Sequence, residues 1–149
     1  MVDHESYMEL ALAEARHAGA RGEVPVGAVL VRHGIVIAGA GNTRELENDP
    51  LGHAELNVIR QGCRILGDWR LTGCTLYVTL EPCPMCAGAI LNARLDKVVY
   101  GAADPVMGCL GSRIHLFDLD MGVRPLVTPG VLAEPCGQLL RAFFETRRL

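Results

Sequence analysis

Pro82-Cys83-Pro84-Met85-Cys86 and, earlier in the chain, His53-Ala54-Glu55 are the two short stretches around which this chain is organised, and together they supply one imidazole, one carboxylate and two thiolates. Cys83 and Cys86 are separated by Pro84 and Met85, so on a helix they lie on one face, one turn apart. The two prolines favour a helix that begins here, because proline fits the first turn of a helix and not its interior. A helix start also has unpaired N–H groups and a positive dipole end, which stabilise thiolates.

One imidazole and two thiolates form a ligand set for zinc. His53 supplies nitrogen from another part of the chain, and Cys83 and Cys86 supply sulfur. Zinc accepts nitrogen and sulfur ligands together, and three protein ligands leave its fourth position to water. We therefore expect one Zn(2+) per chain, in an open and catalytic site.

The remaining cysteines have no ligand spacing to one another and are expected to be buried, inert thiols: Cys63, Cys74, Cys109 and Cys136. If Cys63 or Cys74 supplied a fourth ligand to the zinc, no position would be left for water and the site would be structural. Without a secretion signal, the C-x-x-C pair favours metal binding in a reducing cytoplasm over disulfides.

Glu55 is the candidate catalytic residue. A zinc-bound water has its pKa lowered toward neutrality, but it still needs a base for its proton and an acid for the group that it attacks. One carboxylate can do both in succession. Residues two apart in a helix interior point to different sides, so His53 and Glu55 converge only if a helix begins at this point. The turn composition of Asp49-Pro50-Leu51-Gly52 supports that placement.

The pattern H-x-E followed by P-C-x-x-C resembles the signature of the zinc-dependent cytidine/deoxycytidylate deaminase superfamily. Within that superfamily the chain is most similar to the bacterial tRNA-specific adenosine deaminases. Further short motifs that resemble this family extend over nearly the whole chain: Glu23-Val24-Pro25-Val26-Gly27-Ala28-Val29, Gly41-Asn42, Leu76-Tyr77-Val78-Thr79-Leu80-Glu81, Met85-Cys86-Ala87-Gly88-Ala89 and Phe143-Phe144-Glu145-Thr146-Arg147-Arg148.

The resemblance implies hydrolytic deamination of adenosine to inosine at the wobble position of tRNA. A zinc-activated water would attack the amino-bearing carbon, while Glu55 carries protons from the water to a ring nitrogen and to the departing ammonia. A deaminase of a free nucleobase or nucleoside, of the guanine or cytidine type, is the alternative. A zinc-stabilised module without activity is a third reading, which the presence of Glu55 disfavours.

The resemblance also implies substrate contacts by Asn42, Ala54 and Asp104. The Asn42 position touches the nucleoside in relatives, and the N–H groups of Ala54 and Cys83 hold the substrate edge. The Asp104 position lies near the bound nucleic acid. Each polar side chain has a local alternative, since Asn42 could make a turn bond and Asp104 could form a turn before Pro105.

The chain departs from the bacterial tRNA enzymes in the region after Asp104. The usual enzyme has a lysine where Val106 stands, and an Asn-His pair where this chain has Asp120-Met121-Gly122-Val123-Arg124. Both changes remove polar or basic groups near the expected RNA path. A formal net charge of −3 does not indicate a nucleic-acid binder either. Only arginines could form a local phosphate-binding patch, since Lys97 is the sole lysine; the candidates are Arg70, Arg94, Arg113, Arg124, Arg141, Arg147 and Arg148.

Length and composition favour a single domain over residues 1–149. Half of the residues are hydrophobic, which excludes a disordered chain. The acidic start lacks the regions of a signal peptide, and no apolar run approaches the roughly 18 residues of a membrane span. We therefore expect a cytoplasmic protein that has no membrane contact.

The order of the predicted helices and strands indicates an α/β fold, with a single mixed sheet that has helices on both faces. The resemblance implies that this is a three-layer α/β/α, cytidine-deaminase-like domain with a central mixed sheet of about five strands. In the first helix the expected inward stripe includes Leu10, and in the last helix Phe143 and Phe144 are expected to point inward. The first two strands form a hairpin that is covered on both faces. Helices are expected over residues 3–22, 53–65, 84–93 and 132–148, and strands over 26–31, 35–40, 75–80 and 97–101.

The helix over residues 84–93 is apolar on more than one side, with Met85, Ala87, Ala89, Ile90 and Leu91. A helix that is apolar all round requires a second partner besides its own core. Relatives of the tRNA branch are homodimers with this helix near the interface. The sequence therefore predicts a symmetric homodimer.

Overall fold

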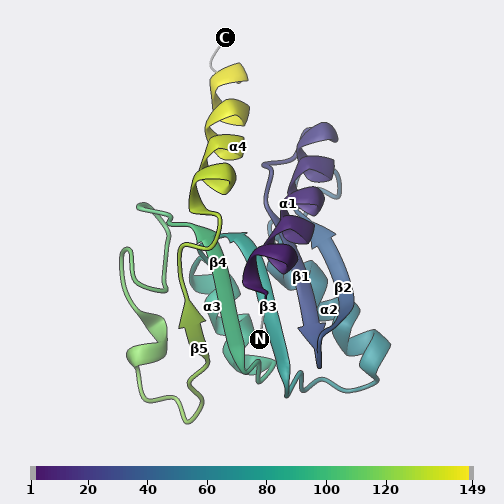
Figure 1. Ribbon diagram of the computed structural model, residues 1–149, viewed down its shortest axis with the longest axis vertical. Coiled ribbons are helices and arrows are strands. Elements are labelled where there is room, and N and C mark those ends of the chain that lie inside the picture. Colours follow the sequence, from purple (N-terminus) through teal and green to yellow (C-terminus); the bar gives the residue numbers. More distant parts are fainter. Residues whose placement is uncertain (1–2, 148–149) are drawn as a thin grey trace.

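The computed structural model describes residues 3–147 and contains one five-stranded sheet between two layers of helices (Figure 1). This arrangement confirms the predicted α/β/α architecture. In chain order the elements are α1 (His4–Ala20), β1 (Gly27–Arg32), β2 (Ile35–Gly41), α2 (Ala54–Leu66), β3 (Cys74–Leu80), α3 (Pro84–Asn92), β4 (Lys97–Ala102), the 3-10 helix η1 (Leu116–Asp118), β5 (Leu126–Thr128) and α4 (Ala133–Thr146).

The sheet is mixed, with strand order β2-β1-β3-β4-β5. β1 is antiparallel to both β2 and β3, whereas β3, β4 and β5 run parallel. The predicted hairpin joins β1 to β2 through His33 and Gly34, which both have positive φ, at 52° and 74°. Two successive residues with positive φ give a turn that matches the twist of the flanking strands. The parallel strands β3 and β4 are connected by α3, as a crossover requires.

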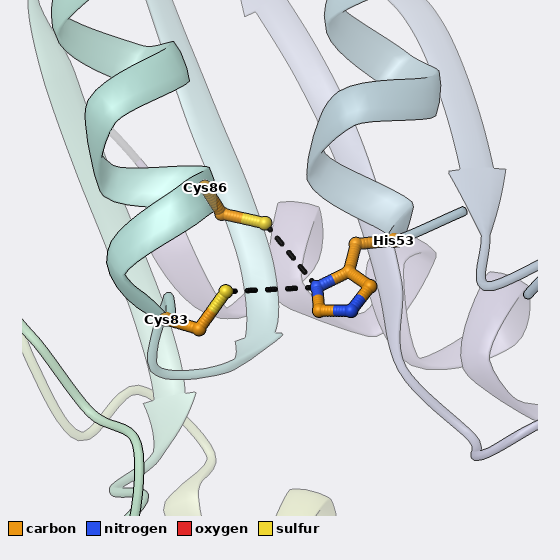
Figure 2. A group of neighbouring side chains, drawn as sticks. All are labelled: His53, Cys83 and Cys86. Carbon is orange, nitrogen blue, oxygen red and sulfur yellow. Dashed lines mark hydrogen bonds between the residues drawn. The ribbon is translucent and has the colours of Figure 1, made fainter. Parts of the chain in front are cut away.

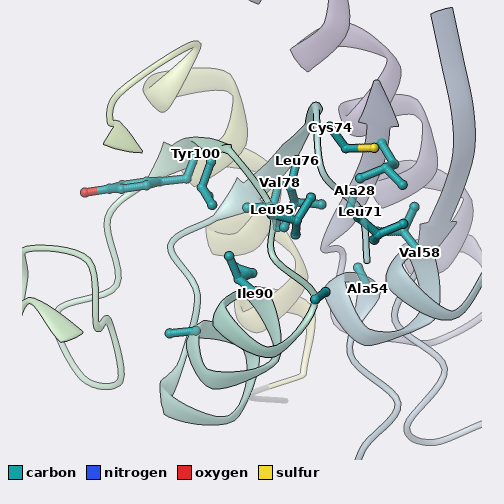
Figure 3. Packing of buried hydrophobic residues seen from close by; sticks show 14 of the residues in the cluster. Ala28, Ala54, Val58, Leu71, Cys74, Leu76, Val78, Ile90, Leu95 and Tyr100 are labelled. Carbon is teal, nitrogen blue, oxygen red and sulfur yellow. The ribbon is translucent and has the colours of Figure 1, made fainter. Parts of the chain in front are cut away.

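Each face of the sheet has its own hydrophobic cluster. Met8 and Leu12 of α1 and Cys136 of α4 pack with Tyr77 and Val99 on one face. On the other face, α2 and α3 cover side chains of β1, β3 and β4, as Figure 3 shows for Val58, Ile90, Leu76 and Val78. Because successive side chains of β3 point to opposite faces, this strand contributes to both clusters.

Several predicted inward positions are wrong. Leu10 is 46% exposed, and Met8 and Leu12 are buried in its place. Residues 7, 8, 10, 11 and 12 are all apolar, so the sequence allowed either of two apolar stripes on this helix to face inward. Packing against β1 determines which of the two is buried. Phe144 is 47% exposed, because the last turns of α4 extend past the sheet (Figure 1). Ile35 and Val36 are exposed at the start of β2, so the hairpin is covered on both faces only further along.

The fold places the predicted metal ligands at one end of the sheet. The carboxyl end of β3 leads through Glu81-Pro82-Cys83 into α3, and α2 begins nearby on the same face. The carboxyl ends of parallel strands are where ligands usually bind in α/β sheets. In the described part of the chain, no helix has both the length and the hydropathy to cross a membrane.

Candidate metal centre and active site

His53 stands immediately before α2 and is its N-cap residue. Its φ and ψ of −90° and 147° are those of extended backbone, and Glu55 lies in the first helical turn. The predicted helix entry between these two residues is therefore present in the structure. The extended backbone at His53 removes the obstacle that a regular helix would impose on a pair two residues apart.

Cys83 holds the same position at the start of α3. Its backbone is also extended, with φ −79° and ψ 175°, and Pro84 follows in the first turn as predicted. Cys86 lies one turn into the helix and is fully buried. Neither His53 nor Cys83 uses its side chain to cap its own helix. Both side chains are therefore free to face each other across the gap between α2 and α3 (Figure 2).

The three ligand atoms converge. The Nδ1 atom of His53 lies 3.7 Å from the sulfur of Cys83 and 3.4 Å from the sulfur of Cys86. All three donor atoms lie within 4.8 Å of one another. Tetrahedral zinc, with bonds of about 2.0–2.1 Å to nitrogen and 2.3 Å to sulfur, separates such atoms by roughly 3.5 Å. The donor set and its spacing therefore fit a zinc ion.

The electrostatics of the cluster favour loss of a thiol proton. The contact with Cys86 lowers the pKa of Cys83 to about 4, against the opposing effect of burial and with the help of His53. The same contact and its burial raise the pKa of Cys86. The hydrogen bond to Cys83 raises the pKa of His53. A cation bound among these atoms would favour both thiolates, because zinc ligands bind deprotonated.

Glu55 is buried beside this cluster, with 4% of its surface exposed. Burial raises the pKa of its carboxyl to about 7, and the backbone hydrogen bond and His53 act in the opposite direction. A carboxyl group next to a metal-ligand set, able to exist in either protonation state, is suited to proton transfer.

Asn42 lies at the end of β2 and contacts the start of α2. Its side-chain oxygen accepts a hydrogen bond of 2.8 Å from the N–H of Ala54. Asn57, which the sequence analysis did not single out, donates to the carbonyl of Gly41 and to the hydroxyl of Thr43, both at 3.0 Å. These bonds fasten the segment around Asn42 to the helix that His53 precedes.

Asp104 forms a turn, which was its local alternative. One carboxylate oxygen accepts hydrogen bonds from the N–H groups of Val106, at 3.0 Å, and Met107, at 3.1 Å. Asp104 also lines an open groove of about 610 Å³ between the carboxyl end of the sheet and α4, together with Leu80, Leu140 and the exposed Phe144. The predicted contact of Asp104 with a substrate stays a prediction.

Two buried carboxylates near the site were missed by sequence reasoning. Glu23 accepts bonds from the N–H groups of Glu45 and Leu46, at 3.0 and 2.6 Å. Glu81 accepts bonds from Asp104, Leu110 and Ser112. The available signal was an acidic residue at the edge of an apolar run, as in Leu80-Glu81-Pro82.

The candidate phosphate-binding arginines do not form one patch. Arg70, Arg94 and Arg124 surround a groove with Lys97, at the start of β4 and so at the opposite end of the sheet from Cys83. Arg70 also pairs with Asp68 at 3.3 Å and Arg124 with Asp118 at 2.5 Å.

Two other arginines belong to the end of the sheet that carries the site. Arg141 lines the groove beside α4 and pairs with Glu134 at 2.7 Å. The guanidinium of Arg147 lies 4.1 Å from the ring centre of Phe143 and donates to the carbonyl of Gly22 at 3.4 Å. Arg148 lies outside the described residues.

Comparison with known proteins gives one consistent family. The family model of MafB19-like deaminases matches residues 2–147. The chain is 51% identical to a tRNA-specific adenosine deaminase of Bacillus subtilis, over 99% of this chain and 92% of that protein.

Two solved structures are similar in both fold and sequence. One, from a study of A-to-I editing by tRNA:A34 deaminases at the wobble position of transfer RNA, has a TM-score of 0.87 and 48% identity, and the match covers 91% of this chain and 99% of that one. The other is a guanine deaminase from Bacillus subtilis, with a TM-score of 0.65 and 41% identity over 68% of this chain and 66% of that one. The chain therefore belongs to the cytidine/deoxycytidylate deaminase superfamily, as a member of the tRNA-specific adenosine deaminase family.

Proposed function

We propose that this protein hydrolytically deaminates adenosine to inosine at the wobble position of tRNA. The observation that carries the proposal is the 51% identity with a tRNA-specific adenosine deaminase over 99% of the chain. The convergence of His53, Cys83 and Cys86 next to a buried Glu55 supports the chemistry independently of that identity.

The residues divide the chemistry among them. His53, Cys83 and Cys86 would hold one zinc ion, which supplies Lewis-acid activation of water near neutral pH. The carboxylate of Glu55 accepts a proton from the attacking water and passes it to a ring nitrogen of adenine. Glu55 then takes the second proton from the hydroxyl that now stands on the carbon and gives it to the departing amino group, so that the carbon keeps its oxygen as a carbonyl and ammonia leaves. One water is consumed, and one ammonia and one inosine are formed.

Asn42, Ala54 and Asp104 are the proposed substrate contacts. The single N–H of Ala54 donates to the side-chain oxygen of Asn42 at 2.8 Å, which holds the amide group of Asn42 in a fixed orientation beside the start of α2. Ala54 would donate to a substrate only by giving up this bond. Asp104 lines the groove of about 610 Å³, in which the exposed ring of Phe144 offers a surface for a stacked base. Nucleotides next to the flipped adenosine would lie in this groove.

A guanine deaminase is the second candidate, because the guanine deaminase of Bacillus subtilis is 41% identical over two thirds of this chain. The region that departs from the bacterial tRNA enzymes, with Val106 and Met121 exposed, also favours it. The two substrates differ in size, since a free base needs the metal pocket alone whereas RNA also needs the groove beside α4.

We propose further that the protein is a homodimer of the cytoplasm. The surface of α3 away from the core carries Pro84, Met85, Gly88 and Ala89, which are not fully buried. Large apolar side chains are exposed on the segment that follows β4: Val106, Met107, Ile114, Leu119 and Met121. A second copy of the chain would cover such a surface. The location follows from the proposed substrate, tRNA.

The deciding experiment gives the purified, zinc-loaded protein an anticodon stem-loop RNA with adenosine at the wobble position. Inosine is measured by nuclease digestion and mass spectrometry, and the same RNA with the adenosine moved by one nucleotide is the control. Ammonia release from guanine, cytosine, adenosine and cytidine is measured in parallel. Inosine at the wobble position alone is expected, and fast ammonia release from guanine without RNA editing would replace the proposal with the second candidate.

A further inference from the structure

Glu81 is a buried carboxylate that the proposed mechanism does not use. It stands between Leu80, the last residue of β3, and Pro82, and only 2% of its surface is exposed. Among residues 3–147 it takes part in no salt bridge. A buried negative charge is costly unless hydrogen bonds satisfy it, so the donors around Glu81 indicate its role.

All of those donors belong to one segment, residues 104–112. One carboxylate oxygen accepts from the N–H of Asp104 at 3.0 Å and from the hydroxyl of Ser112. The other oxygen accepts from the N–H groups of Leu110 and Ser112, at 2.9 and 3.1 Å. The segment therefore wraps around the carboxylate, and both of its ends are held by the same side chain.

The fit around the carboxylate is close. A Cβ at Gly108 would lie 2.5 Å from the carboxyl carbon of Glu81 and 2.4 Å from the carbonyl oxygen of Asp104, so that only glycine fits there. The N–H of Cys109 donates to the carbonyl of Pro82 at 3.0 Å. The same segment is therefore tied both to Glu81 and to the residue before the metal ligand Cys83.

We infer that Glu81 is a positioning residue. It fixes the 104–112 segment, and with it Asp104, at a set distance from Cys83. The groove beside α4 and the proposed metal centre therefore keep a fixed position relative to each other. All four hydrogen bonds of its carboxylate go to the 104–112 segment, so its effect on the site would pass through that segment. Glu81 connects the groove with the metal centre because its backbone leads into α3, while its carboxylate accepts a bond from the N–H of Asp104, which lines the groove beside α4. This inference rests on the proposed action on RNA.

A carboxylate is required for this task because every donor points at it. Three N–H groups and one hydroxyl need four acceptor sites, which an ionised carboxylate has and an amide does not. Glu81→Gln keeps the shape but turns one oxygen into a donor that faces other donors. Hydrogen bonds to charged groups are also the stronger ones. The substitution should therefore loosen the segment without removing bulk.

The test compares Glu81→Gln with the wild type in steady-state kinetics on the stem-loop RNA. We expect the KM for RNA to rise by about tenfold, with kcat within about threefold and one zinc per chain retained. RNA binding would then have to order the loosened segment, and a cost equal to about one charged hydrogen bond corresponds to about a factor of ten in affinity. Ser112→Ala removes one of the four bonds and should move KM in the same direction by a smaller factor. It also serves as the second variant if Glu81→Gln does not fold.

The matched control is Thr79→Val. Thr79 is equally buried and its hydroxyl accepts a bond of 3.1 Å from the N–H of Gly27, within the sheet and away from the 104–112 segment. Thr79→Val should lower the melting temperature and leave KM unchanged. If Glu81→Gln behaves in the same way, its role is structural and the inference is overturned. Loss of zinc in Glu81→Gln would also overturn the inference, because Glu81 would then act by supporting α3, the helix that carries the proposed metal ligands.

Amide hydrogen exchange separates this inference from the proposed function. Exchange over residues 104–112 should be faster in Glu81→Gln and unchanged in Thr79→Val. A wild-type protein that forms no inosine overturns the proposed function alone, whereas unchanged exchange in Glu81→Gln overturns the role of Glu81 whatever the substrate is.

Discussion

At the level of single residues, His53 and Cys83 occupy equivalent positions in their helices. Each is the N-cap of a helix, each has extended backbone, and neither caps its helix with its own side chain. An N-cap side chain normally accepts a bond from the first turn. Here both side chains point instead to a shared centre, and the next turn supplies Glu55 in one case and Cys86 in the other.

Removal of a proposed metal ligand should remove the metal. Cys83→Ala and Cys86→Ala should each reduce zinc content from one equivalent per chain to near zero and lower the melting temperature, because metal binding is coupled to folding. Zinc is measured by atomic emission and stability by circular dichroism. Cys74→Ala, a buried cysteine in the core cluster, is the control that should keep its zinc. Full zinc content in both ligand variants would contradict the assignment.

Glu55 should be separable from metal binding. Glu55→Ala should keep one zinc and a native circular dichroism spectrum, while kcat falls by roughly 100- to 10,000-fold or more, as the loss of a proton carrier predicts. Single-turnover measurements on the stem-loop RNA isolate the chemical step. An active Glu55→Ala protein would refute the proton-transfer role.

At the scale of elements, the contact of α1 with the sheet is set at Gly27. A Cβ at Gly27 would lie 2.1 Å from the carbonyl oxygen of Ala11 and 2.4 Å from the backbone nitrogen of Ala15. The α1 backbone therefore rests directly on β1. This close approach also accounts for the buried stripe of Met8 and Leu12 in place of Leu10.

Gly27→Ala should therefore destabilise the fold. The clash involves backbone on both sides, which cannot move away as a side-chain end can, so we expect a loss of about 1–3 kcal/mol or more. Chemical denaturation measures it. Gly88→Ala in α3 is the matched control, since an added Cβ there meets no atom of the same chain within 4 Å, and alanine favours a helix over glycine by about 0.5–1 kcal/mol. Because Gly88 lies on the proposed dimer surface, the mass of this control is checked by light scattering. Equal stability of wild type and Gly27→Ala would show that α1 can shift.

At the scale of the whole molecule, the two ends of the sheet differ in character. The carboxyl end of β3 leads to the proposed metal ligands and the groove beside α4. The other end carries Arg70, Arg94 and Arg124, two of which already pair with aspartates. Binding of RNA at the proposed metal centre should therefore depend on the arginines near α4 and not on those at the opposite end.

Charge reversal tests that difference. Arg147→Glu should raise the KM for RNA and make the log–log salt dependence of binding shallower by about 0.7, the value for one phosphate contact on a single strand. Arg70→Glu, at the opposite end, should leave both unchanged. Binding is followed by fluorescence anisotropy over a salt series, with the melting temperature as a check because Arg147 contacts Phe143. A flat salt response of the wild type would point to the small-substrate alternative.

Assembly is tested at the same scale. Light scattering at micromolar concentration should give the mass of two chains, since α3 and the segment after β4 expose apolar surface. Met107→Glu places a charge on that surface and should weaken the dimer, whereas Ile35→Glu, at a more exposed position of β2, should not. A monomeric wild type would contradict the proposed homodimer.

Features that depend on near neighbours in the chain could be predicted from the sequence alone. The C-x-x-C spacing, the prolines around Cys83 and the turn before His53 were sufficient to predict two helix starts and a His/Cys/Cys cluster. The positive φ values at His33 and Gly34 agree with the predicted hairpin. These inferences succeeded because helix entry and turn geometry are set within a few residues.

Features that depend on residues far apart in the chain could be seen only in the folded structure. Glu81 bonds to Ser112, 31 residues away, and Glu23 bonds to Leu46, 23 residues away, and no local pattern indicates either pair. The inward stripe of α1 and the division of the arginines between two ends also follow from packing. A buried carboxylate takes whichever N–H groups the fold brings to it, so its partners are known only once the loops are placed.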